Sequence, residues 1–302
     1  MMLTSSTFPE RLKNMINPKK KELTFILLAI GLWLIATPIT YNFYHIAFNN
    51  DLACGILLIL FGIIALIRPA SINFILFLLI GLWLHFAPIF FWYPESIYYL
   101  NDTLIGTAVS IIAFGFLQKS DQKKEKNSPS SWAHRVPTIF IALICWLLAR
   151  YLDTYQLGYI DEVWDPFFSN GTKKVLTSSV SKAFPVPDAG LGAYAYFLEA
   201  LLAWQGGENR WKSMPWIVLS FGVLAIPVGI TSIVLIILQP LIVGAWCFIC
   251  LVIAFLMLLI VLLSIKEVIA VLRCVKILYM QKKPIWKFIV FGDATMQLSN
   301  IK

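Results

Sequence analysis

Eight apolar segments of near-spanning length constrain this chain more than any single motif. A helix needs about 20 mostly apolar residues to cross the hydrocarbon core of a bilayer. The segments are 23–40, 52–67, 72–92, 103–118, 136–152, 187–204, 215–238 and 240–264. Only 13 % of the residues are charged, against roughly a quarter in soluble domains, and the mean hydropathy is +0.79. The sequence therefore predicts an all-α integral membrane protein with about eight transmembrane helices; the fifth and sixth segments are short, so seven is the alternative count.

The basic residues are distributed in a way that predicts the orientation. Lys and Arg gather before the first span, after the fourth span and in the tail, whereas the turns at 40–50 and 92–102 contain neither. By the positive-inside rule, both termini and the linker are expected in the cytoplasm and the loop 153–186 outside. The net charge of +8 is thus an orientation signal, and no nucleic-acid partner is expected. An amphipathic piece at 265–283 is expected to lie at the membrane surface.

An internal repeat of about fifty residues organises the first half of the chain. Gly31, Trp33 and Pro38 recur as Gly81, Trp83 and Pro88, and Asn50-Asp51 recurs as Asn101-Asp102. Each unit is expected to be a two-helix hairpin, in which glycine allows close helix approach and Asn-Asp caps the second helix. The pattern resembles the SPW-repeat membrane module over 23–118, with Thr37-Pro38-Ile39 and Ala87-Pro88-Ile89 in place of Ser-Pro-Trp. The resemblance implies a scaffold of two helical hairpins.

A polar linker, 119–135, separates this module from the second half, because its Lys, Glu, Ser and Asn residues cannot build a core. The expected division is a cytoplasmic segment 1–22, a repeat module 23–118, the linker, a bundle 136–265 and a cytoplasmic tail 266–302.

Cys247 and Cys250 form a Cys-x-x-Cys pair inside the last apolar segment. Residues three apart lie on one face of a helix, close enough to cycle between dithiol and disulfide. Zinc normally takes four ligands, and there is no second Cys pair and no nearby His. The spacing favours a redox pair, about two turns deep in the span and near its outer end, with a buried structural pair as the alternative.

The second half also resembles the vitamin K epoxide reductase family over residues 136–265. The resemblance rests on the helix spacing, on Phe184-Pro185-Val186-Pro187-Asp188 at the start of a span, and on Trp246-Cys247-Phe248-Ile249-Cys250-Leu251. It implies a four-helix bundle that encloses a quinone, with Cys250 facing the quinone and Cys247 exchanging electrons with the outside. Ubiquinone or menaquinone would be the co-substrate, and a periplasmic thioredoxin-like protein the thiol partner, in a bacterial inner membrane.

Four further residues are candidates for contact with the quinone. By resemblance, Ser178, Ser179 and Phe184 would line the pocket, although helix capping and loop packing explain them equally well. Asp188 either caps its helix or contacts bound quinone through a hydrogen bond. Glu199, a carboxylate within a span, is a further functional candidate.

One departure from the family keeps a second function open. Family members carry two cysteines in the outer loop, whereas this loop has none, and Thr172 and the region of Trp164 stand in their place. The alternative to an enzyme is therefore a non-enzymatic membrane scaffold or binding protein that kept the fold. No nicotinamide is expected, because the glycine-rich run at Gly190 follows no strand, and no metal is expected, because His, Asp and Glu do not cluster.

Overall fold

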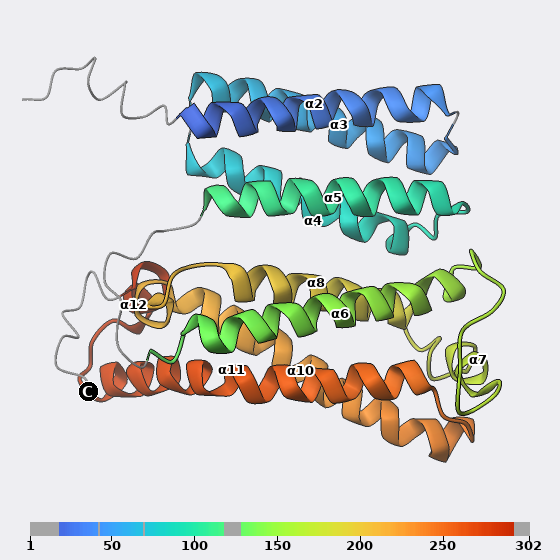
Figure 1. The fold of residues 1–302 in the computed structure, drawn as a ribbon. Helices are drawn as coiled ribbons and strands as arrows, with labels where there is room; N and C mark the ends of the chain where they lie inside the picture. Colours follow the sequence, from blue (N-terminus) through green and yellow to red (C-terminus); the bar gives the residue numbers. More distant parts are fainter. Residues whose placement is uncertain (1–17, 42, 69, 118–127, 293–302) are drawn as a thin grey trace, which may run out of the picture. The chain divides into compact units, whose positions relative to one another are not determined.

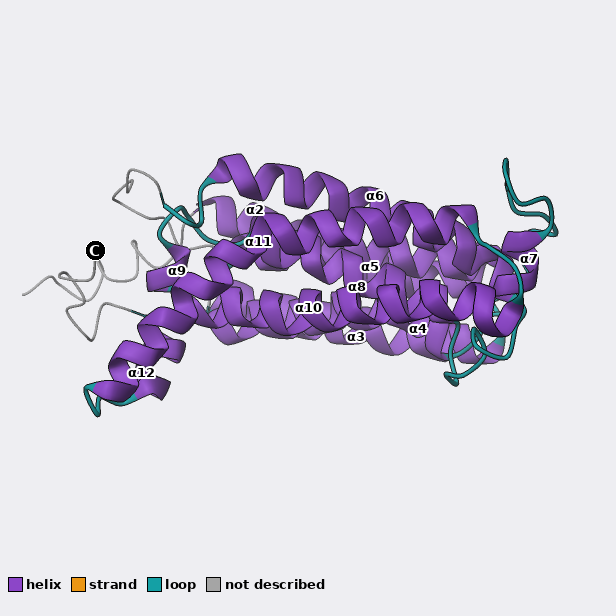
Figure 2. Cartoon of the chain, turned by 90° about the horizontal axis from the view of Figure 1, so that it is seen from below, coloured by secondary structure: helices purple, strands orange, loops and turns teal. Residues whose placement is uncertain are grey.

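The computed structural model describes residues 18–41, 43–68, 70–117 and 128–292, and within these ranges the chain is helical and contains no strand (Figure 1). Figure 2 shows the helices joined by loops, with irregular chain on both sides of the short α7. The chain divides into two compact units, 1–117 and 118–302. The all-α fold expected from the sequence is confirmed.

The N-terminal unit consists of two helical hairpins. Its helices are α2 (Pro18–Thr40), α3 (His45–Ile67), α4 (Ser71–Phe90) and α5 (Ser96–Phe116). The glycines of the repeat hold each hairpin together, since a Cβ on Gly55 would lie 2.7 Å from the carbonyl oxygen of Gly31, and one on Gly106 would lie 2.6 Å from that of Gly81. Such close helix approach is typical of packing in membranes.

The repeated Asn-Asp pairs do not cap helices, and this expectation was wrong. Helices α3 and α5 begin about seven residues before the apolar segments, so Asp51 and Asp102 each lie in the second turn of a helix. The residues that precede the two helices, Tyr44 and Glu95, make no capping hydrogen bond through their side chains. The Asn and Asp side chains instead form hydrogen bonds between the hairpins.

The C-terminal unit is a four-helix bundle of α6 (Trp132–Gln156), α8 (Asp188–Trp204), α10 (Pro215–Leu238) and α11 (Phe248–Met280). Helix α6 packs against α8 and α11, and α10 packs against α8 and α11. The core between them contains small, aliphatic, thioether and aromatic side chains, among them Ala142, Cys145, Ala149, Tyr196, Phe221, Ile253 and Met257. Short helices α7 (Gly171–Leu176), α9 (Arg210–Ser213) and α12 (Ile285–Phe291), and a π-helical turn η1 (Gln239–Val243), complete the unit.

Seven of the described helices are long and apolar enough to cross a membrane. The expected span that is not among these seven is segment 187–204, which forms α8. This helix has 17 residues, because it begins at Asp188, after Pro187, and ends at Trp204, before Gly206. At 1.5 Å per residue it is about 26 Å long, close to the lower limit for a spanning helix. Seven spans are therefore supported by length and composition, and the eighth stays a prediction.

The last helix differs from the expected span at both ends. It begins at Phe248 rather than at 240, because the π-helical turn and the left-handed Gly244 (φ 66°) interrupt the apolar segment. It continues without a break to Met280, so the piece at 265–283 is not a separate surface helix. That extension is helical because Val268, Val271, Cys274 and Leu278 pack with Trp211 and Phe288 in a small core of their own.

Buried polar contacts hold the end of the bundle where α8 and α10 are joined. Arg210 forms an ion pair with Glu267 (2.6 Å), and Ser130 donates a hydrogen bond to the same carboxylate (2.5 Å). Arg135 donates to the carbonyl oxygens of Ala203, Trp204, Gln205 and Gly207. Residues from 128 onward, which the sequence placed in the linker, are thus part of this unit; residues 118–127 lie outside the described ranges.

Candidate redox site

Cys247 and Cys250 form a disulfide at the beginning of α11, with their Cα atoms 5.3 Å apart. Cys247 is the residue before the helix, and its Sγ accepts a hydrogen bond from the backbone N–H of Cys250 (3.1 Å). The N–H of Cys247 donates to Oε1 of Gln239 (2.9 Å), a buried residue in the π-helical turn. The pair therefore stands at a helix N-terminus and not two turns inside a span, as the hydropathy had indicated.

This position favours thiolate chemistry when the pair is reduced. The N-terminus of a helix carries a partial positive charge and backbone N–H groups without intrahelical partners. Both stabilise a thiolate, which is the nucleophilic form of cysteine. The N–H of Cys250 already points at the sulfur of Cys247, so the contact that would stabilise a thiolate there exists in the oxidised protein.

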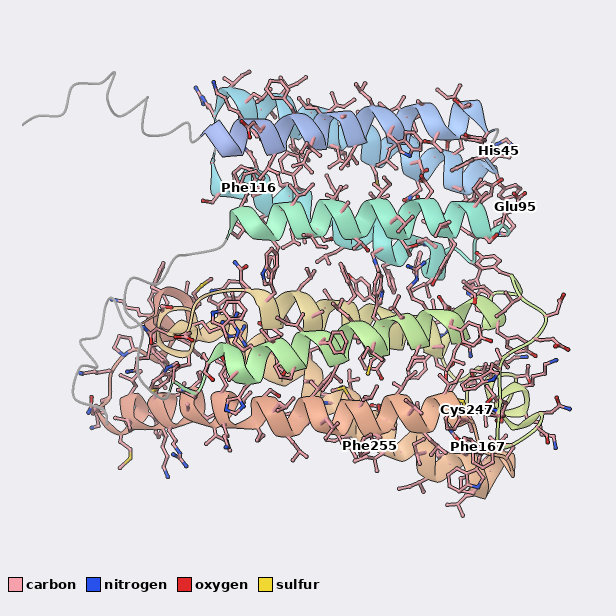
Figure 3. All side chains as sticks on the ribbon, in the orientation of Figure 1. His45, Glu95, Phe116, Phe167, Cys247 and Phe255 are labelled. Atoms are coloured by element: carbon pink, nitrogen blue, oxygen red, sulfur yellow. A yellow bond between two sulfur atoms is a disulfide. The ribbon has the colours of Figure 1, made fainter. Side chains whose placement is uncertain are left out.

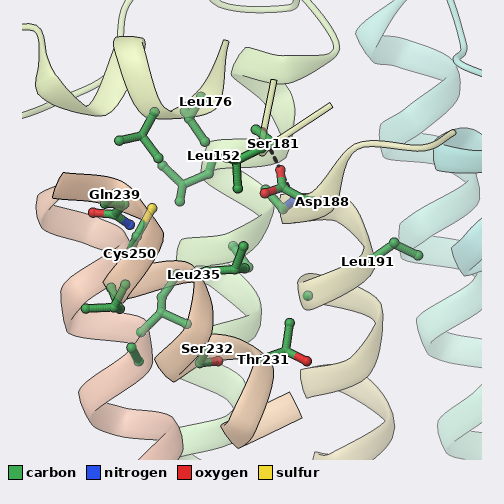
Figure 4. Close-up of a pocket in the computed structure, with 18 of the residues that line it drawn as sticks. Leu152, Leu176, Ser181, Asp188, Leu191, Thr231, Ser232, Leu235, Gln239 and Cys250 are labelled. Carbon is green, nitrogen blue, oxygen red and sulfur yellow. Dashed lines mark hydrogen bonds between the residues drawn. The ribbon is translucent and has the colours of Figure 1, made fainter. Parts of the chain in front are cut away.

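A cavity of about 240 Å³ lies beside Cys250, between α6, α8, α10, α11 and the loop that contains α7 (Figure 4). Most of its wall is aliphatic, and the apolar lining includes Ala149, Leu152, Val175, Leu176, Leu191, Val228, Leu235 and Ile253. Its polar lining comprises Ser178, Ser181, Asp188, Thr231, Ser232 and Gln239. Apolar walls with a few placed polar groups are typical of small-molecule sites.

The structure brings four of the six candidate site residues to this cavity. Cys250, Ser178, Phe184 and Asp188 line it. Ser179 is exposed and does not line it, because the turn at 178–181 directs Ser178 and Ser181 inward. Cys247 is fully buried and lies outside the cavity, so the two sulfurs face different surroundings.

Asp188 is the centre of a hydrogen-bond network at the N-terminus of α8. Its Oδ1 accepts from Ser181 Oγ (2.7 Å) and from Nε2 of Gln156 on α6 (2.5 Å). Gln156 also accepts the N–H of Ala189 through Oε1 (3.1 Å). Gln156, Ser181 and Gln239 were not singled out from the sequence, since isolated polar residues in loops and helix ends carry no pattern. The network fixes the loop and two helices around the cavity.

The long loop also covers Cys247. Phe248 contacts Trp164 and Phe167, with ring centroids 5.7 and 5.0 Å apart. Figure 3 labels Phe167 and Cys247 at this end of the bundle. On the other side of Cys247, Gly171 lies so close to Trp246 that an added Cβ would come within 2.3 Å of its carbonyl oxygen. The loop thus contacts both neighbours of Cys247, and this explains why the sulfur is buried.

The carboxylate of Asp165 holds this part of the loop. Asp165 accepts hydrogen bonds from the backbone N–H of Phe168 (2.9 Å), and from the N–H (2.9 Å) and hydroxyl (2.8 Å) of Thr172. Thr172 is fully buried. The cysteines of the described residues outside the disulfide are Cys54, Cys145 and Cys274, which are buried and lie outside the loop.

Glu199 lies apart from the cavity, fully buried on α8, and neither of its carboxylate oxygens has a hydrogen-bond partner. Among the described residues, no group of three or more His, Cys, Asp or Glu side chains could hold a metal ion.

Comparison with known families agrees with this geometry. Residues 136–265 match the vitamin K epoxide reductase family. Residues 21–115 match the SPW repeat domain, so both resemblances inferred from the sequence are confirmed. The vitamin K epoxide reductase match contains the disulfide and all the residues that line the cavity, and it ends inside α11. Neither the curated proteins nor the solved structures contain a match to this chain.

Proposed function

We propose that this protein is a membrane thiol/disulfide:quinone oxidoreductase of the vitamin K epoxide reductase type. The observation that carries the proposal is the asymmetry of the disulfide: Cys250 lines an apolar cavity, whereas Cys247 lies outside it under the loop. A redox pair that connects two substrates needs this arrangement, with one sulfur toward each of them.

The reaction transfers two electrons and two protons from a dithiol to a quinone. A thiolate of the donor attacks one sulfur of the Cys247–Cys250 disulfide, forms a mixed disulfide with it and releases the other cysteine as a thiolate. The second donor thiol then attacks the donor sulfur of the mixed disulfide and releases the second cysteine. The donor leaves as a disulfide, and Cys247 and Cys250 become thiols. The reduced pair passes two electrons to quinone, which takes up two protons to become quinol, and the Cys247–Cys250 disulfide forms again.

Each group at the cavity has a role that follows from its chemistry. The aliphatic walls suit the ring of ubiquinone or menaquinone and keep water from the reacting sulfur. The hydroxyl groups of Ser178 and Ser232 donate to the carbonyl oxygens of Val175 (2.7 Å) and Val228 (2.9 Å), and each would have to rotate to donate to a quinone carbonyl instead. Gln239 joins the π-helical turn to the backbone of Cys247 and so fixes the disulfide against the cavity.

The donor side requires the loop to move. Because Cys247 is fully buried between residues that the loop contacts, a thiol protein reaches it only after residues 164–171 are displaced. The loop has no cysteine of its own to relay electrons, so we propose that a periplasmic thioredoxin-like partner exchanges directly with Cys247. The positions of the basic residues support a bacterial inner-membrane location with both termini in the cytoplasm.

The direct test is turnover in a quinone-containing bilayer with a dithiol donor. Wild-type protein is expected to oxidise one dithiol for each quinone reduced, and the Cys247→Ser/Cys250→Ser variant is expected to show no rate above the bilayer alone. Cys145→Ala is the matched control, because Cys145 is buried in the same bundle but does not line the cavity. It should turn over as the wild type does.

The burial of Cys247 and the lack of loop cysteines favour one alternative, a scaffold or binding protein that retains the fold without the reaction. Wild-type turnover no faster than that of the double variant, across several dithiols and both quinone classes, would establish that alternative.

A further inference from the structure

The two repeats of the N-terminal unit exchange polar side chains across the interface between the hairpins. Asn50 donates through Nδ2 to Oδ2 of Asp102, and Asn101 donates to Oδ2 of Asp51, both at 3.1 Å. The amide oxygens of the same asparagines accept from indole N–H groups, Asn50 from Trp83 (2.8 Å) and Asn101 from Trp33 (3.1 Å). The arrangement is nearly two-fold symmetric and brings the two carboxyl groups together at its centre.

Among the residues that the structure describes, no counter-charge pairs with these carboxyl groups. Both Asp51 and Asp102 are fully buried, and they lie within hydrogen-bonding reach of each other. Neither forms an ion pair with a described residue. Oδ1 of Asp51 is buried and has no hydrogen-bond partner, although the other three oxygens of the pair accept from Asn50, Asn101 or Tyr93.

The amide groups indicate what the pair binds. A cation site would turn the asparagine oxygens toward the carboxylates, but here the indole groups hold those oxygens and the N–H₂ groups face inward. Hydrogen-bond donors around two adjacent carboxyl groups stabilise one negative charge on the pair. A second negative charge beside the first, in apolar surroundings, would be very costly in free energy. Oδ1 of Asp51, which accepts no hydrogen bond, is the oxygen that can carry the proton.

We propose that Asp51 and Asp102 form a proton-binding dyad, in which two carboxyl groups share one proton. The dyad gives the repeat module a chemistry beyond the scaffold role that the sequence suggested. It does not depend on the thiol–quinone reaction.

Tyr93 connects the dyad to the surface. Its hydroxyl donates to Oδ2 of Asp102 (3.1 Å), and its ring lines an open groove at the hairpin tips together with Tyr44, Trp92 and Glu95. Burial, and then the nearby carboxyl groups of Asp102 and Asp51, raise the pKa of Tyr93, so its hydroxyl remains a donor. The dyad is thus one hydrogen bond from a groove that solvent can enter.

The other titratable groups near the dyad do not neutralise it. Cys54 on α3 faces the carboxyl groups as a buried thiol. His85 on α4 contacts the Thr107 hydroxyl (3.2 Å), and Glu95 before α5 is exposed. On the described part of α2, Lys21 and Glu22 are exposed in the first turns, whereas Trp33, which reaches the dyad, is about three turns further along.

Dicyclohexylcarbodiimide tests the proposal, because it modifies protonated carboxyl groups in apolar surroundings. In membranes at neutral pH, mass spectrometry of the full-length protein should find one adduct per chain, on Asp51 or Asp102. The yield should exceed that on the exposed Glu95 by about tenfold or more, since a shared proton keeps one carboxyl group neutral. Asp51→Asn/Asp102→Asn should lose the adduct. Tyr93→Phe removes a donor to the charged form, so labelling should persist to higher pH than in the wild type.

Three outcomes would overturn the dyad. The first is labelling of neither aspartate at neutral pH when both react in acid. The second is two adducts on one chain, which would mean that both groups are protonated independently. The third is protection by Na⁺ relative to choline, which would mean that the pair binds a metal cation and not a proton.

Discussion

At the scale of single residues, the two cysteines of the redox pair differ because of their neighbours and not their spacing. Cys250 lines the aliphatic cavity. Cys247 donates its backbone N–H to Gln239, and the loop packs against its neighbour Trp246. The Cys-x-x-Cys motif and the family resemblance predicted the pair and the residues Ser178, Phe184 and Asp188. They did not predict the burial of Cys247, because the contacts that bury it come from residues some eighty positions away in the chain.

Asp165 provides a pH test of how the loop is held. Partial burial by itself would favour the neutral acid, but the hydrogen bonds from Thr172 and Phe168 outweigh it and lower the pKa of Asp165. A lowered pKa in the folded state stabilises the loop fully above the unfolded value of about 3.9, and this stabilisation is lost as the pH falls through the folded value. Hydrogen-exchange protection of the Phe168 and Thr172 amides, corrected for intrinsic rates, should therefore fall in acid.

Asp165→Asn should lower the protection of the same amides roughly tenfold near neutral pH and remove its acid dependence, since hydrogen bonds to a charged group are worth about 1.5–3 kcal/mol. Asp161→Asn, at an exposed position of the same loop, should change neither. Equal protection in the Asp165 and Asp161 variants would show that the carboxylate does not hold the loop.

At the scale of the helices and loops, hydropathy located the apolar segments well but missed breaks within them. Residues 240–247 are apolar, so a window scan joins them to α11, whereas Pro240 and the left-handed Gly244 end one helix before the next begins. Pro240 and Gly244 were the available signals for this break. For the Asn-Asp pairs, the sequence predicted local helix caps, whereas their hydrogen-bond partners lie in the other hairpin. Capping rules use only residues close in the chain, so they do not detect such long-range partners.

The contact between α7 and the residues before α11 leads to a prediction about access. In Gly171→Ala the added Cβ would meet the Trp246 carbonyl at 2.3 Å, and two backbone segments must separate. Overpacking of this kind costs about 1–3 kcal/mol, and 1.4 kcal/mol changes an opening equilibrium about tenfold. A water-soluble thiol should then reduce the Cys247–Cys250 disulfide roughly tenfold faster, measured by alkylation of the released thiols.

Ser179→Ala is the control, since Ser179 is exposed in the same loop and outside the cavity. Its reduction rate should equal that of the wild type. If Gly171→Ala is also unchanged, the loop does not limit access to the disulfide, and the proposed displacement on the donor side is wrong.

At the scale of the whole molecule, the change in sequence character near the linker coincides with the division into two compact units. Each unit has its own core, and each matches a different family model. Polarity alone did not predict where the second unit begins, because Ser128, Ser130 and Arg135 are polar like the rest of the linker. In the structure, Ser128 donates to the carbonyl oxygen of Glu208, Ser130 to the carboxylate of Glu267, and Arg135 to the carbonyl oxygen of Trp204 at the end of α8.

A chain that begins at Ser128 should therefore insert and form the Cys247–Cys250 disulfide without the repeat module. Its thermal midpoint is expected within about 4 °C of the corresponding transition of the full chain, equivalent to about 1 kcal/mol. A chain that begins at Pro137 lacks Ser130 and Arg135, leaves Glu267 and four carbonyl groups short of donors, and should unfold at a clearly lower temperature. Degradation of the Ser128 form, with the full chain stable, would show that the bundle requires the repeat module.

The central claim is that the sulfur of Cys250 meets the quinone, and absorption spectroscopy of two single variants tests it most directly. In Cys247→Ser, a lone Cys250 thiolate remains beside the cavity at a helix N-terminus, so added quinone should produce a visible charge-transfer band. Cys250→Ser should show no band, because Cys247 does not line the cavity. A band in Cys250→Ser alone, or no band in either variant with quinone bound, would contradict the account.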